Sequence, residues 1–88
     1  MLQFIFHTDP GHGWLEVDKD LVLKLGTKIS TYSYIKDGKV YLEEDCDATA
    51  FISDLKDAGL KFTVIPRRVD YDSPVRSYNR VKKEDLRQ

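Results

Sequence analysis

The sequence predicts a compact single domain of the α+β class, in which a mainly antiparallel sheet carries two helices packed on one face. Three observations support this prediction. The chain has 88 residues, of which 41% are hydrophobic, so it can build one core but not two. Asp37-Gly38 separates two β-prone runs, which is a strong hairpin signal. Two short segments have the apolar spacing of helices, and each ends at a glycine.

The first third of the chain is predicted to form two strands and a short helix. Residues 2–8, LQFIFHT, are rich in aromatic and branched side chains and end at the turn sequence DPG. Residues 14–17, WLEV, are predicted to form the second strand. Asp18 is then expected to cap a helix of two turns that ends at Gly26.

The rest of the predicted domain contains the hairpin, a second helix and a last strand. Asp47 is expected to cap the second helix, which ends at Gly59. Pro66 is expected to stop the last strand. The predicted order is β-β-α-β-β-α-β, with strands at residues 2–8, 14–17, 29–35, 39–43 and 60–65.

Charge divides the chain into an acidic body and a basic end. Residues 1–65 carry eleven acidic and seven basic side chains, whereas residues 66–88 carry four acidic and seven basic ones. We therefore expect a globular domain at residues 1–66 and a basic C-terminal tail at residues 67–88, which packs through Val75 and Tyr78. Neither charge is large enough to indicate a DNA mimic or a nonspecific nucleic-acid binder.

Cysteine content and hydropathy indicate the compartment. Cys46 is the one cysteine, so no internal disulfide forms, and no Cys/His cluster has zinc-finger spacing. The apolar run before His7 is too short for a signal peptide, and no stretch approaches the ~18–20 apolar residues of a membrane span. The sequence therefore predicts a cytoplasmic protein without a membrane partner. A homodimer through an exposed strand edge is an alternative to a monomer.

The loop HTDPGHGW, residues 7–14, is the first candidate site. Its imidazole and carboxylate groups suggest a metal site, in which carboxylates of the acidic run would complete the ligand set. The alternative is a rigid structural or partner-contacting loop, since the proline and glycines explain its shape and Trp14 anchors the next strand. The metal hypothesis uses His7, Asp9, His12 and Asp45.

The acidic run YLEEDCDA, residues 41–48, is the second candidate. Carboxylates just before a helix favour its N-terminus by ~0.3–1 kcal/mol each. This effect explains Asp45 and Asp47, but it explains less well why four acidic residues occupy five positions. Their mutual repulsion suggests that a cation, a basic partner or the basic tail neutralises them. Cys46 within this run is expected to be a buried small residue rather than a nucleophile.

Aromatic side chains of the predicted hairpin are a third candidate. Tyr32 and Tyr34 are expected to lie on one side of their strand and could stack on single-stranded nucleic acid. The acidic body and the lack of an RNA-recognition signature do not favour this. Phosphates would contact Arg67, Arg68, Arg76, Arg80, Lys82 and Lys83.

Three segments, HTDPGHGWLEV, LGTKISTYSY and YLEEDCDATAF, together resemble a family of small bacteriophage and mobile-element proteins that have such segments in this order. The resemblance covers residues 7 to about 60. It implies an origin in a phage and a role inside a bacterial host, where such proteins often bind and inhibit a host protein. It implies no catalytic residue.

We therefore expect a phage-encoded binding protein without a cofactor, which acts on a host protein, with a defence system as one class of target. The alternatives are a small metal-dependent hydrolase or nuclease and a single-strand nucleic-acid binder. The expected partner-binding residues are His12, Trp14, Glu43, Glu44, Asp45, Asp47, Arg67, Arg68 and Arg76.

Overall fold

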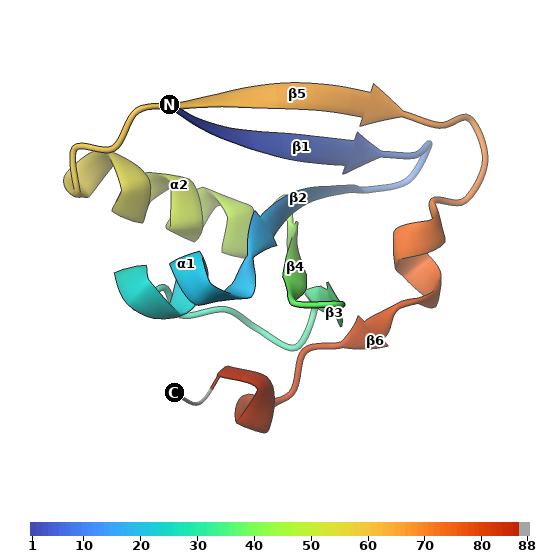
Figure 1. Ribbon diagram of the computed structural model, residues 1–88. Coiled ribbons are helices and arrows are strands. Elements are labelled where there is room, and N and C mark those ends of the chain that lie inside the picture. The colour runs from blue at the N-terminus through green and yellow to red at the C-terminus, as the bar shows by residue number, and fades with distance from the viewer. Residues whose placement is uncertain (87–88) are drawn as a thin grey trace.

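A computed structural model describes residues 1–86. Within them, six strands form one sheet in the order β5-β1-β2-β4-β3-β6, in which only β1 and β5 are parallel neighbours. The predicted α+β class is confirmed (Figure 1). Along the chain the elements are β1 (Leu2–Thr8), β2 (Gly13–Asp18), α1 (Lys19–Leu25), β3 (Tyr34–Lys36), β4 (Lys39–Glu43), α2 (Asp47–Asp57), β5 (Phe62–Arg68), the 3-10 helix η1 (Pro74–Ser77), β6 (Asn79–Arg80) and the 3-10 helix η2 (Lys83–Leu86).

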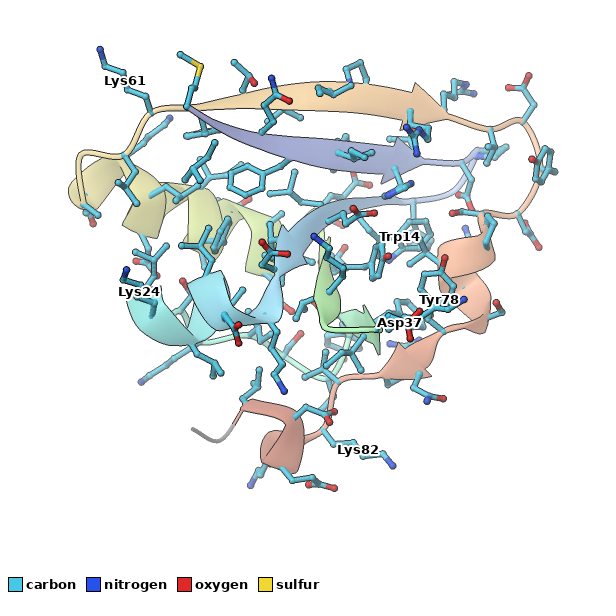
Figure 2. The ribbon with its side chains drawn as sticks, viewed as in Figure 1. Trp14, Lys24, Asp37, Lys61, Tyr78 and Lys82 are labelled. Atoms are coloured by element: carbon cyan, nitrogen blue, oxygen red, sulfur yellow. The ribbon has the colours of Figure 1, made fainter. Side chains whose placement is uncertain are left out.

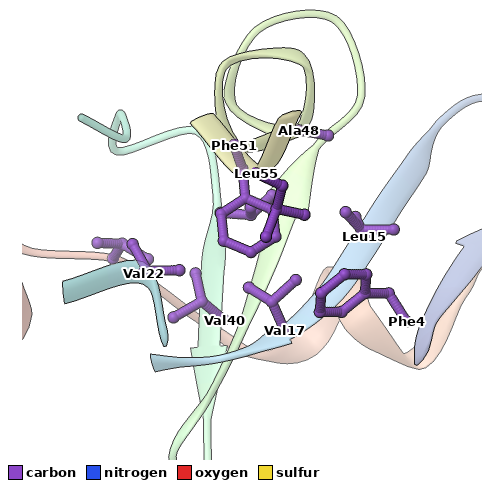
Figure 3. Packing of buried hydrophobic residues seen from close by; sticks show 10 residues of the cluster. Phe4, Leu15, Val17, Val22, Val40, Ala48, Phe51 and Leu55 are labelled. Carbon is purple, nitrogen blue, oxygen red and sulfur yellow. The ribbon is translucent and has the colours of Figure 1, made fainter. Parts of the chain in front are cut away.

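The main core lies between the sheet and the two helices. Alternate strand residues point to this side, as the period of two in a strand requires. The ring of Phe51 from α2 meets the edge of Phe4 from β1 at 5.5 Å between centroids. Each fully buried side chain of this kind contributes roughly 1.5–3 kcal/mol. Figure 3 shows part of the cluster, whose buried members are Phe4, Leu15, Val17, Val22, Val40, Leu42, Ala48, Phe51, Leu55 and Val81.

The opposite side of the sheet, here called the far face, has a second and smaller cluster. Trp14 and Tyr41 of the sheet pack there against Val75 of η1. The chain reaches this position through residues 69–78, the crossing segment, which leads from β5 at one edge of the sheet to β6 at the other (Figure 1). The predicted packing through Val75 and Tyr78 is confirmed, and the expected tail contributes a sixth strand to the sheet.

The hairpin turns at Asp37-Gly38 as predicted. Both residues have positive φ, 52° and 78°, which a tight two-residue turn between twisted strands requires. The first strand of the hairpin is shorter than predicted, because it begins only at Tyr34. Before it, the hydroxyls of Ser30 and Ser33 donate hydrogen bonds to the buried Asp47 carboxylate at 2.8 and 2.5 Å, which holds residues 30–33 as a turn.

Both helices end where predicted, and α1 also begins where predicted, directly after Asp18. Gly26 after α1 and Gly59 after α2 both have left-handed φ, near 70°. Asp18 occupies the predicted N-cap position of α1, but its side chain makes no capping hydrogen bond. The prediction for α2 is wrong, because Cys46 is the N-cap residue and Asp47 is the first residue of the helix. Asp18 instead pairs with Lys39 on the neighbouring strand, and Asp47 is buried against Ser30 and Ser33. Within residues 1–86, no helix is long and apolar enough to cross a membrane.

The prediction that Pro66 stops the last strand is also wrong. β5 continues through Pro66 to Arg68, and Pro66 lies beside Phe6 in the parallel pair with β1. A proline is tolerated in a strand at the edge of a sheet when its nitrogen faces away from the neighbouring strand. β5 is such an edge, so the missing N–H costs no hydrogen bond within the sheet.

Candidate recognition site

The DPGHG loop is organised by one buried carboxylate. Asp9 is only 4% exposed, and its Oδ1 accepts hydrogen bonds from the backbone N–H groups of Gly11 and His12, both at 2.9 Å. A backbone hydrogen bond also closes the turn, because the Asp9 N–H donates to the His12 carbonyl at 2.9 Å. The loop is therefore a rigid turn that presents the exposed His12.

The same carboxylate ties the loop to the crossing segment. Arg76 donates to both Asp9 oxygens, from Nε at 2.6 Å and from Nη2 at 2.9 Å, and the Ser73 N–H donates to Oδ2 at 2.9 Å. The Arg76 guanidinium and the backbone donors hold the pKa of Asp9 well below its usual range, while Asp9 raises the pKa of Arg76. A Cβ at position 11 would lie 2.8 Å from Arg76 Nη2, so a larger residue there would displace the guanidinium from its position against Asp9.

Next to this pair is an open pocket of about 420 Å³ on the far face, here called the Trp14 pocket. It is formed by the DPGHG loop with β2, the turn before β3, the turn before α2, and the segment from η1 to β6. Figure 2 shows Trp14 between the strands and η1. The residues that line the Trp14 pocket are His12, Trp14, Tyr32, Tyr34, Glu43, Asp45, Cys46, Arg76 and Arg80.

Aromatic rings and guanidinium groups alternate along one side of the Trp14 pocket. The Cζ atom of Arg76 lies 5.4 Å from the centroid of the Trp14 ring, and that of Arg80 lies 4.7 Å from the centroid of the Tyr34 ring. The rings of Trp14 and Tyr34 meet edge to face at 6.2 Å. Such stacking holds both arginines in place without using all of their hydrogen-bond donors.

The two arginines differ in whether a carboxylate neutralises their charge. The charge of Arg76 is matched by Asp9, whereas the Arg80 Nη1 makes only long contacts with the Thr31 and Tyr32 carbonyls, at 3.5 and 3.4 Å. In the described part of the chain, no carboxylate lies within ion-pair distance of Arg80. Arg80 is therefore the cation of this pocket that is available to a ligand.

Carboxylates occupy another part of the pocket lining. Glu43 Oε2 accepts hydrogen bonds from the N–H groups of Asp45 and Cys46, both at 3.1 Å, which shapes the turn before α2. Asp45 is exposed. Cys46 is exposed too, so the prediction that it is buried is wrong, because the buried face of α2 begins one residue later at Asp47.

The structure brings together five of the nine expected partner-binding residues: His12, Trp14, Glu43, Asp45 and Arg76. The other four lie elsewhere. Glu44 is close to Gly13, Asp47 is buried beneath residues 30–33, and Arg67 and Arg68 are on β5. The sequence predicted Tyr32, Tyr34 and Arg80 only as possible nucleic-acid contacts. It did not place them beside His12 and Trp14, because that proximity depends on how the chain folds across the sheet.

The residues of the metal hypothesis do not gather. His7 points to the far face from β1, where its Nε2 lies 2.9 Å from Glu16 Oε1 and its ring 5.7 Å from that of Tyr41. Asp9 is occupied by its hydrogen bonds, and only His12 and Asp45 line the Trp14 pocket. Among residues 1–86, no group of three or more His, Cys, Asp or Glu side chains could hold a metal ion.

The Trp14 pocket thus combines anchored aromatic rings with the Arg80 guanidinium and the carboxylates of Glu43 and Asp45. Comparison with protein-family models, curated proteins and solved structures gave no match for this chain.

Proposed function

We propose that this chain is a phage-encoded binding protein without enzymatic activity, which binds and modulates a host protein in the bacterial cytoplasm. A component of a defence system is the class of target that its resemblance to phage proteins suggests. The single observation that supports binding is the Trp14 pocket, where four chain segments bring aromatic rings and arginines to one open surface. Trp, Tyr and Arg are the residues enriched in interface hot spots.

The pocket is held ready for a partner. The Asp9 hydrogen bonds fix the loop and Arg76, and the stacked arginines fix the rings, so little side-chain freedom is lost on binding. Preorganisation of this kind raises the affinity of a protein interface without adding contacts.

The lining also indicates what the partner offers. Arg80 would bind a carboxylate of the partner, and Glu43 with Asp45 would bind a lysine or arginine. Tyr32, which is 66% exposed, would cover an apolar or aromatic side chain seated between them. The partner surface is therefore a mixed patch of both charges around an apolar centre.

Two matched tyrosines test this proposal. Tyr32 belongs to the pocket and is 66% exposed, whereas Tyr71 lies outside it and is 67% exposed. Immobilised wild type, Tyr32→Ala and Tyr71→Ala would be incubated with bacterial lysate at physiological salt, and the captured proteins quantified by mass spectrometry. We expect a specific protein that Tyr71→Ala retains and Tyr32→Ala loses. Capture of nothing by wild type, or equal loss in both variants, would contradict the proposal.

Binding of single-stranded nucleic acid is a second candidate, favoured by one observation. Tyr32 and Tyr34 line the pocket together with Arg76 and Arg80, and aromatic rings next to arginines are what unstacked bases and phosphates contact. The carboxylate of Asp45 in the same pocket opposes it. Fluorescence anisotropy of a labelled oligonucleotide measures this directly, and real binding must weaken steeply as salt rises.

A further inference from the structure

The outer edge of β5 is an open and largely apolar surface. Six of its seven residues are exposed, and they include Val64 and Ile65 at 41% and 43%. Leu60, just before the strand, is exposed as well. Leu60 and Lys61 also line a hollow of about 530 Å³ at the start of the strand. An exposed apolar edge strand is a template for a further strand.

The backbone of β5 shows which groups are free at this edge. The Lys61 carbonyl accepts from Leu2, and the Val69 N–H donates to Thr8, so odd-numbered residues face β1. The even-numbered residues from 62 to 68 therefore direct their N–H and C=O groups outward. Only Pro66 among them lacks a donor, which leaves most of the ladder available.

Positive charge lies at both ends of this edge. Lys61 precedes the strand, and Arg67 and Arg68 end it, while residues 62–66 carry no charge. Within residues 1–86, only Arg68 of these three has an ion-pair partner, the exposed Asp70 at 3.3 Å. A strand that pairs with β5 would therefore gain from acidic residues near its two ends.

A second copy of the chain suits this edge poorly. Two β5 strands pairing with each other would double the positive charge along the joint and place a proline from each copy in the shared ladder. A foreign strand meets only one proline and can bring the opposite charge.

We propose that the β5 edge binds an extended, acid-flanked apolar segment of another protein by addition of a strand. This surface shares no residue with the Trp14 pocket, so it goes beyond the function proposed above. Main-chain hydrogen bonds to residues 62, 64 and 68 supply register, and the acidic flanks select the segment.

Titration of isotope-labelled protein with two peptides tests the proposal by NMR. One peptide is DEVTVTVED, and its control, KKVTVTVKK, has the same centre and basic flanks. We expect the acidic peptide to bind about tenfold more tightly, as two favourable charge contacts replace two unfavourable ones. The backbone amide signals of Phe62, Val64 and Arg68 should shift most. Equal binding of both peptides, or shifts confined to the Trp14 pocket, would overturn the proposal.

Two variants make the test independent of one substitution. Val64→Pro removes an outward N–H while leaving the inward groups intact, as Pro66 does already, and should weaken the acidic peptide about fivefold. Lys61→Glu with Arg68→Glu should reverse the preference between the peptides even if Val64→Pro fails to fold. Unchanged preference in the double variant overturns the proposal. So does a dimer of the wild type in sedimentation experiments that Val64→Pro abolishes, because β5 would then pair with a second copy of itself.

Discussion

The two sides of the sheet are stabilised in different ways. The side toward α1 and α2 is sealed by aliphatic and phenylalanine side chains. The far face is covered by the crossing segment, which is held by Val75 and by the ion pair between Asp9 and Arg76. The side toward the helices is stabilised by the hydrophobic effect, which does not depend on direction. The far face also depends on charge-assisted hydrogen bonds, which have a fixed geometry and join residues distant in the chain.

The difference explains where the candidate site lies. A surface filled with aliphatic side chains has no group left to offer a partner. On the far face, each ring that packs also carries a polar neighbour, as Trp14 does with Arg76 and Tyr34 with Arg80. On the far face, the residues that line the candidate site therefore also take part in packing.

The largest effect is expected from the helix side. Phe51 is fully buried against Phe4 and the sheet. Phe51→Ala should lower the free energy of unfolding by about 3–5 kcal/mol, because it removes buried apolar area and leaves a cavity. Urea denaturation followed by circular dichroism measures this, and a loss below about 1 kcal/mol would show that the core is not organised around this ring.

A smaller loss is expected when the far face is opened at its apolar contact. Val75→Ala removes two buried methyl groups and should cost about 2 kcal/mol. Hydrogen exchange should show faster exchange in the crossing segment and little change in α2. Uniform acceleration over the whole chain would indicate instead that both sides of the sheet unfold as one unit.

The ion pair of the far face predicts a dependence on pH. Because the pKa of Asp9 is depressed in the folded state, its stabilisation is complete above the ordinary aspartate pKa of 3.8 and is lost as the pH falls further. Asp9→Asn should therefore be less stable than wild type at pH 7, and the difference should shrink at about pH 3. Denaturation at both pH values tests this, and a constant difference would exclude the charge as its cause.

The smallest effect on stability is expected at the pocket itself. Tyr32→Ala alters a side chain that is mostly exposed, so the free energy of unfolding should change by no more than about 0.5 kcal/mol. Thermal denaturation beside Tyr71→Ala gives the comparison. A large loss in Tyr32→Ala alone would mean that its effect on binding reports folding rather than contact.

Local patterns in the sequence predicted most of the elements. Asp37-Gly38 and the glycines after both helices adopt positive φ. Residue type alone predicts this conformation at these positions, without knowledge of the tertiary structure. Cys46 and Asp47 were misjudged because their burial depends on how α2 meets the turn at residues 30–33. The edge position of Pro66 likewise depends on strand order, which propensity alone does not contain.

The sequence by itself determined the α+β class, the hairpin and the rigid DPGHG turn, because each depends on side chains close together along the chain. Only the tertiary structure decided that Asp9 holds Arg76, 67 positions later, instead of serving a metal ligand set. It also carried Arg80 to Tyr34 and so completed the Trp14 pocket. Contacts of this kind depend on the path of residues 69–78 across the sheet, which no local pattern specifies.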